Sequence, residues 1–83
     1  METSAIKDQI KGIITQNTQL KVEQIGDDAE LHGNLGIDSL TLLEIALSID
    51  QEFETDFNEE ELLQMHTVNK AAEMVSGRIS VNS

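Results

Sequence analysis

The chain has no cysteine, proline, tryptophan or tyrosine, and only two phenylalanines among its 83 residues. Without cysteine it has neither a disulfide framework nor a thiol of its own. No apolar run approaches the roughly 18–20 residues that a membrane span needs. The N-terminus also lacks the basic-then-apolar layout of a signal peptide. These absences predict a protein that does not associate with membranes and is located in the cytoplasm.

Basic residues are scarce, and the net charge is −11. All five lie near the two ends of the chain: Lys7, Lys11, Lys21, Lys70 and Arg78. Residues 22–69 contain no lysine or arginine, but they hold thirteen of the sixteen acidic residues. Such a surface repels nucleic acid and attracts basic patches on proteins, although acidity also simply keeps a small protein in solution. The charge therefore predicts protein partners and no nucleic acid.

Apolar residues recur at helical spacing in two segments near the ends of the chain. Residues 4–16 carry the first stripe: Ile6, Ile10, Ile13 and Ile14. After Thr67, a candidate helix cap, comes the second stripe: Val68, Ala71, Ala72, Val75 and Ile79. Gly77 weakens the end of this helix, and residues 80–83 are expected to fray.

The central helix is predicted over residues 39–53, and it is apolar on two sides. One side should face the core: Leu42, Ile45, Ala46, Ile49 and Phe53. The other side is a stripe of Leu40, Leu43 and Leu47. This second stripe either is covered by the next loop or short helix, or is exposed for a partner.

A short helix should follow the central one, because Asn58 and Glu61 have the spacing of a capping box. Its contacts are expected from Leu62, Leu63 and Met65. Residues 17–37 show no sustained period, and they should cross the bundle as a long loop that buries its own apolar residues. A short helical turn near residues 28–31 is an option. The fold class is thus all-α: a small four-helix bundle in a single domain, residues 1–83.

Ser39 is the candidate modification site. Asp38 is a good N-cap for the central helix, which places Ser39 at its first position, facing outward. The free N–H groups and the positive end of the helix dipole favour a phosphate there.

Catalytic and metal-binding patterns are missing. A serine nucleophile needs an oriented histidine base, but His32 and His66 have no catalytic context and are expected to be solvated loop residues. Asp27, Asp28 and Glu30 lack the spacing of a calcium-binding loop. The protein is therefore predicted not to be an enzyme and to hold no metal.

A family resemblance rests on the middle of the chain. Residues 35–40 read Leu-Gly-Ile-Asp-Ser-Leu, and Glu44, the run Asp-Gln-Glu-Phe at 50–53 and Thr-Val at 67–68 follow. Asp-Ser-Leu alone recurs by chance. At a helix start, after a long loop and in an acidic chain of this size, it resembles the acyl carrier proteins over nearly the whole length.

The resemblance implies that a phosphopantetheinyl transferase attaches 4′-phosphopantetheine from coenzyme A to Ser39, and that the arm's thiol carries acyl groups as thioesters. It implies that Asp38 helps the transferase to recognise the site. The other partners implied are ketosynthase, acyltransferase or ligase type enzymes with basic docking patches, bound by a monomeric carrier. Candidate contacts for them are Leu40, Leu43, Glu44, Leu47 and Asp50.

Three departures from the family pattern bear on the pathway. Thr41 and Gln51 stand where acidic residues are common, and Asn58 replaces a frequent proline. They indicate a specialised pathway, polyketide or polyketide–peptide hybrid, with fatty acid biosynthesis as the other option. Met1 and the short tail indicate a freestanding protein. A competing hypothesis is an acidic helical adaptor that binds a basic protein without any prosthetic group.

Overall fold

The computed structural model describes residues 3–82, and this part of the chain forms helices and no strand. The α-helices are α1 (Thr3–Asn17), α2 (Ser39–Glu52), α3 (Glu59–Leu62) and α4 (Val68–Asn82), and a 3₁₀ helix, η1, spans Val22–Gln24. The prediction of an all-α fold with three longer helices, one short helix and a long loop before α2 is confirmed.

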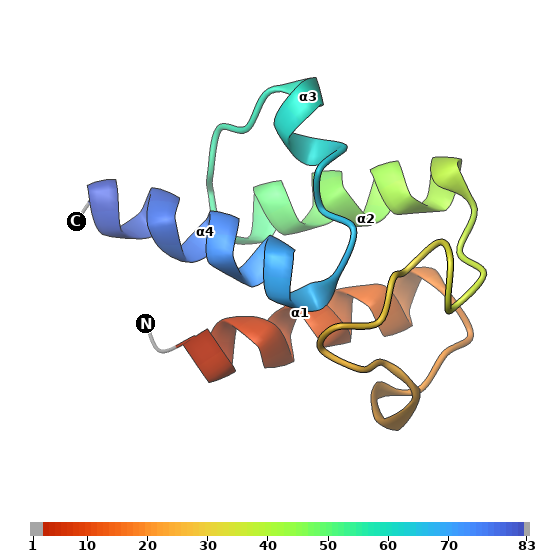
Figure 1. The fold of residues 1–83 in the computed structure, drawn as a ribbon. Coiled ribbons are helices and arrows are strands. Elements are labelled where there is room, and N and C mark those ends of the chain that lie inside the picture. Colours follow the sequence, from red (N-terminus) through yellow and green to blue (C-terminus); the bar gives the residue numbers. More distant parts are fainter. Residues whose placement is uncertain (1–2, 83) are drawn as a thin grey trace.

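α1 packs against both α4 and α2, and α3 packs against α2 (Figure 1). The core forms because each long helix turns its apolar stripe inward, and isoleucine is its commonest residue. Its fully buried large side chains are Ile6, Ile10, Ile14, Ile45, Ile49, Val68 and Val75. On α2 the predicted core face is buried at Ile45, Ala46 and Ile49, and Leu42 and Phe53 pack at its edge.

The two ends of the molecule differ (Figure 1). α1 begins and α4 ends at one end, whereas α2 begins at the opposite end, beside the long loop. α4 is helical to Asn82, and Ser83 lies outside the described residues, so the fraying expected for residues 80–83 remains a prediction. Thr67 caps this helix as expected, because its Oγ1 accepts the Lys70 backbone N–H at 3.0 Å.

The long loop buries Ile25, Leu31 and Ile37, as predicted, but leaves Val22 47% exposed on η1. The helical turn that was an option near residues 28–31 is not found as such: turns cover residues 27–28 and 31–35 instead. In the second of them, the backbone N–H groups of Asn34 and Leu35 both donate to the Glu30 carbonyl. Gly36 then takes a φ of 71°, which other residues adopt at a cost, and redirects the chain toward α2.

Asp27 ties the long loop to two helices. Its carboxylate lies 2.7 Å from Lys11 Nζ and 3.4 Å from Lys7 Nζ on α1, and its carbonyl accepts the Asn69 N–H of α4 at 3.0 Å. The hydrogen bond from Lys11 is the main reason that the pKa of Asp27 is lowered from its ordinary value of 3.8.

We expect Asp27→Asn to lower the free energy of unfolding at neutral pH by less than about 1 kcal/mol, as for partly exposed ion pairs. Because the folded-state pKa is lowered, the ionised carboxylate stabilises the fold above the unfolded-state value of 3.8, and this contribution is lost as pH falls through the folded-state pKa. Denaturant melts at a series of pH values should therefore show variant and wild type converging in acid. Asp8→Asn, at an exposed position of α1, is the matched control. A gap that stays constant down to the lowest pH would contradict the role of this charge.

Candidate functional site

The start of α2 is fixed by Asp38, as predicted. Its backbone is extended, with φ −73° and ψ 165°, and its Oδ1 accepts the Thr41 N–H at 2.8 Å. That hydrogen bond is the main cause of the lowered pKa of Asp38. The carboxylate therefore stays ionised at neutral pH and holds the first turn of the helix in place.

Ser39 is the first residue of α2, and its side chain is exposed. The partial positive charge of the helix end gathers at this position. A group bonded to Ser39 would be open to solvent on one side and would have a free path to the adjoining surface.

An apolar pocket of about 230 Å³ opens beside Ser39. Leu62 and Met65 are buried and form its floor. Leu42 and Leu43 of α2 are half-buried along its side. The lining is completed by His32, Leu63 and His66, all of them exposed. The serine thus stands at the edge of a hydrophobic hollow between α2 and the α3 segment.

Three leucines of α2 and the α3 segment face solvent. Leu40 is 68% exposed, Leu63 is 55% exposed and Leu47 is 43% exposed. Of the predicted second stripe only Leu43 is half-buried, and it lines the pocket together with Leu63. Of the three residues expected to supply contacts for the short helix, Leu62 and Met65 are buried, whereas Leu63 is exposed and contributes to the pocket lining. Glu44 is exposed on the same helix.

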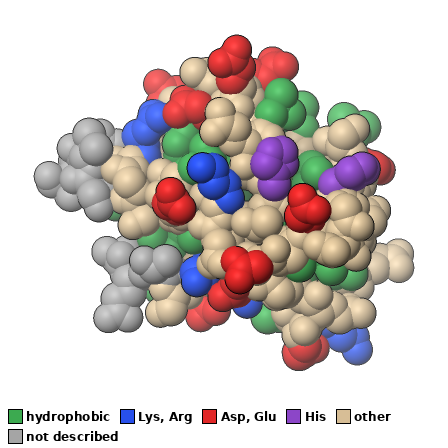
Figure 2. Space-filling model, in the orientation of Figure 1, with side chains coloured by type: hydrophobic (Ala, Val, Ile, Leu, Met, Phe, Trp, Pro, Cys, Tyr) green, Lys and Arg blue, Asp and Glu red, His purple; other side chains and the backbone are tan. Residues whose placement is uncertain are grey.

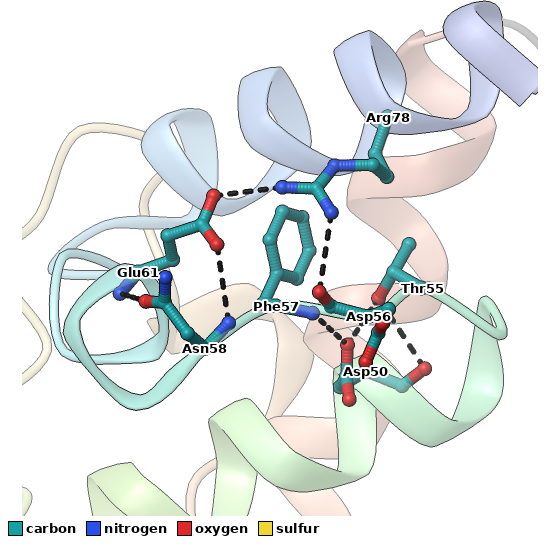
Figure 3. A network of polar contacts seen from close by, with 7 residues as sticks. All are labelled: Asp50, Thr55, Asp56, Phe57, Asn58, Glu61 and Arg78. Carbon is teal, nitrogen blue, oxygen red and sulfur yellow. Dashed lines mark hydrogen bonds and ion pairs between the residues drawn. The ribbon is translucent and has the colours of Figure 1, made fainter.

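Asp50 has a structural role that the sequence did not show (Figure 3). Its Oδ1 accepts the Thr55 Oγ1–H at 2.5 Å and the Phe57 N–H at 3.1 Å, so it folds the segment after α2 back onto the helix. Phe57 is buried and packs under Arg78 of α4, whose guanidinium lies 4.6 Å from the ring centroid. Asp50 is half-buried, and contact with a partner remains a prediction for it.

Side-chain contacts at the start of α3 tie this short helix to α4 (Figure 3). Asn58 and Glu61 form the predicted capping box: Glu61 N–H donates to Asn58 Oδ1 at 2.8 Å, and Asn58 N–H donates to Glu61 Oε1 at 3.1 Å. Arg78 Nη2 lies 2.7 Å from the other Glu61 oxygen. The short helix is therefore tied at its start and to α4.

Sequence reasoning missed the histidines. His32 and His66 were expected to be solvated loop residues; both are exposed, but both also line the pocket beside Ser39. Figure 2 shows the two histidines near each other on one face, with hydrophobic side chains between them. No sequence signal marks the pair, because the two segments meet only in the folded chain.

Within residues 3–82, no group of three histidine, cysteine or acidic residues is arranged to hold a metal ion. In the same part of the chain, no helix is long and apolar enough to cross a membrane.

Comparison with known proteins decides the family. Residues 8–75 match the family described as "Phosphopantetheine attachment site". The chain belongs to this family. It is 32% identical to the acyl carrier protein of Buchnera aphidicola subsp. Acyrthosiphon pisum (strain 5A) over 73 residues, which cover 88% of this chain and 91% of that protein. It is 30% identical to the acyl carrier protein of Coprothermobacter proteolyticus over 79 residues, which cover 95% and 96%.

The fold agrees with this family of acyl carrier proteins. A solved structure of the acyl carrier protein from Enterococcus faecalis matches with a TM-score of 0.76, at 22% sequence identity, over 94% of this chain and 99% of that one. Members of the family are carriers rather than catalysts, and they bear covalently attached 4′-phosphopantetheine. The chain is therefore a carrier that interacts with a phosphopantetheinyl transferase and with biosynthetic enzymes. The competing hypothesis of an adaptor without a prosthetic group is set aside.

The described residues fit such a group. An exposed hydroxyl at a helix start leaves room for a phosphodiester, and the neighbouring pocket has an apolar lining. Because the chain has no cysteine, the arm supplies the thiol that carries the acyl group.

Proposed function

We propose that residues 1–83 act as one acyl-carrier domain in which Ser39 is the attachment residue for 4′-phosphopantetheine. The observation that supports this most directly is the position of Ser39: it is exposed, it opens α2, and it borders the apolar pocket. Asp38 presents the serine by fixing the first turn, and we propose that the transferase recognises this carboxylate.

The pocket gives the carrier a place for the apolar part of its cargo. Its floor of Leu62 and Met65 and its sides of Leu42 and Leu43 present hydrocarbon. Burial of an aliphatic group there would stabilise it by about 0.8 kcal/mol per methylene. An acyl group held in this way would be shielded from water until a partner draws it out.

The experiment is incubation of the unmodified protein with coenzyme A and a promiscuous phosphopantetheinyl transferase. The intact mass should rise by one phosphopantetheinyl group. A mass that stays unchanged with several transferases would contradict the proposed function.

Partner enzymes of ketosynthase, acyltransferase or ligase type are proposed to dock on the α2 face beside Ser39. Leu40, Leu43 and Leu47 would supply apolar contact, and Glu44 and Asp50 would pair with basic patches. Since such charges mainly steer encounter, association should slow as salt rises.

We expect Glu44→Lys to reduce the association rate with a basic partner enzyme by roughly tenfold at low salt, and to weaken the salt dependence. Glu73→Lys makes the same charge change at an exposed position of α4 and is the matched control. Stopped-flow binding at several salt concentrations measures both. Equal effects of the two substitutions would show that net charge, rather than this face, governs docking.

For the pathway, we propose polyketide or hybrid biosynthesis ahead of fatty acid biosynthesis, in the cytoplasm. The support is the uncharged residues where the family often has acids, Thr41 and Gln51, together with Asn58, which caps α3 in place of a proline. The acyl mass on the protein purified from its own host tests this: simple saturated chains would contradict it.

A further inference from the structure

Both histidines of the chain stand at the rim of the pocket beside Ser39. His32 comes from the long loop and His66 from the connection between α3 and α4. A backbone hydrogen bond, from Leu31 N–H to the His66 carbonyl at 2.9 Å, joins the two segments directly next to His32. His32, His66 and Ser39 are exposed and line the same pocket, whose Leu62 and Met65 are buried.

The ring of His32 is oriented by its own loop. Its Nδ1 lies 2.6 Å from the carbonyl oxygen of Ile37, two residues before Ser39. A carbonyl oxygen only accepts hydrogen bonds, so Nδ1 carries the hydrogen whatever the charge of the ring. Nε2 is therefore an acceptor in the neutral ring and becomes a donor when the ring gains a proton.

The two imidazoles are the only side chains between residues 22 and 69 that take up positive charge, because this stretch holds no lysine or arginine. Two carboxylates face them. Glu30 lines a second hollow together with both histidines. Asp38 has a pKa lowered mainly by the Thr41 N–H and in smaller part by the charge of His32. The α3 segment contributes only apolar side chains to the pocket lining.

We propose that His32 and His66 form an anion subsite for the phosphodiester of the arm carried on Ser39. The proposal rests on the attachment at Ser39 put forward above. When protonated, the imidazoles donate charge-assisted hydrogen bonds to the phosphate oxygens and keep the first part of the arm at the pocket rim. When the imidazoles lose their protons, this hold is released.

The linkage is reciprocal. If the phosphodiester favours the charged imidazoles, its attachment must raise the pKa of both histidines. Glu30 and Asp38 act on the imidazoles in the modified and unmodified protein alike, so the difference between the two forms isolates the contribution of the phosphate.

The experiment is an NMR titration of the imidazole signals in the unmodified and the phosphopantetheinylated protein. We expect both pKa values to be higher in the modified protein by about 0.5–1 unit, less than for a buried charge pair because the site is exposed. The ³¹P signal of the modified protein should move with the same midpoint, since a phosphodiester does not itself titrate in this range. The double variant His32→Gln, His66→Gln should abolish that movement, and circular dichroism confirms its fold.

Unchanged histidine pKa values together with a flat ³¹P signal would overturn the subsite while leaving the carrier function intact, because the modified protein was formed. A second control adds millimolar inorganic phosphate to the unmodified protein at matched ionic strength. If the histidine pKa values rise there as much as they do on attachment of the arm, the proposal is also overturned, since the site would then bind free anions. Failure to modify the protein at all would instead contradict the proposed function.

Discussion

Replacement of Ser39 by alanine is expected to abolish phosphopantetheine transfer completely. The transfer forms a bond between the serine oxygen and phosphorus and breaks the pyrophosphate linkage of coenzyme A, with adenosine 3′,5′-bisphosphate as the leaving group. Alanine has no oxygen to form the new bond. Since Ser39 is exposed at the first position of α2, its loss should change the free energy of unfolding by no more than about 0.5 kcal/mol. Intact-mass measurement after incubation with coenzyme A and transferase, with a denaturant melt of the same sample, tests both statements.

Ser48→Ala is the matched control for this experiment. Ser48 lies on the same helix and is half-buried, away from the helix start. Its variant should gain the arm as wild type does. If Ser39→Ala still gained the arm while Ser48→Ala did not, the proposed attachment residue would be wrong.

The second large effect is expected at Asp50. Asp50→Ala removes the acceptor of the Thr55 hydroxyl and of the Phe57 N–H, and both donors lie in a half-buried region. Hydrogen bonds to a charged group contribute about 1.5–3 kcal/mol, so the free energy of unfolding should fall by about 2 kcal/mol. Loss of this anchor should also loosen the contact of Phe57 with Arg78.

Asp50→Asn keeps one oxygen and the side-chain shape, so it should recover part of the lost stability while it removes the charge. Urea unfolding of both variants measures the stability, and partner association measures the docking. If Asp50→Ala melts as wild type does and only docking weakens, the carboxylate serves the surface rather than the fold.

Local patterns were enough to predict the frame of the site. The cap at Asp38, the start of α2 at Ser39 and the capping box of Asn58 and Glu61 depend on hydrogen bonds between residues three apart, and all were found as expected. The core faces followed from helical periodicity. These features are determined by neighbours along the chain, so the sequence shows them directly.

The features that the sequence did not show depend on contacts between distant segments. His32 and His66 meet because Leu31 pairs with the His66 backbone, and no spacing rule predicts that bond. Leu63 turns outward because α3 has only four residues and buries just one side of the segment. Asp50 lies in the last turn of α2, where the helix dipole is unfavourable for a negative charge. Its presence there is explained by the hydrogen bonds that it accepts from the following loop.

The placement of the helix ends bears on how the protein is handled in the laboratory. α1 begins and α4 ends at the end of the molecule opposite to the start of α2 (Figure 1). A fluorophore, an affinity tag or a sensor chip coupled at either terminus would therefore stand well away from Ser39. Immobilised in this way, the carrier would present its leucine-lined face to the solution in a uniform orientation.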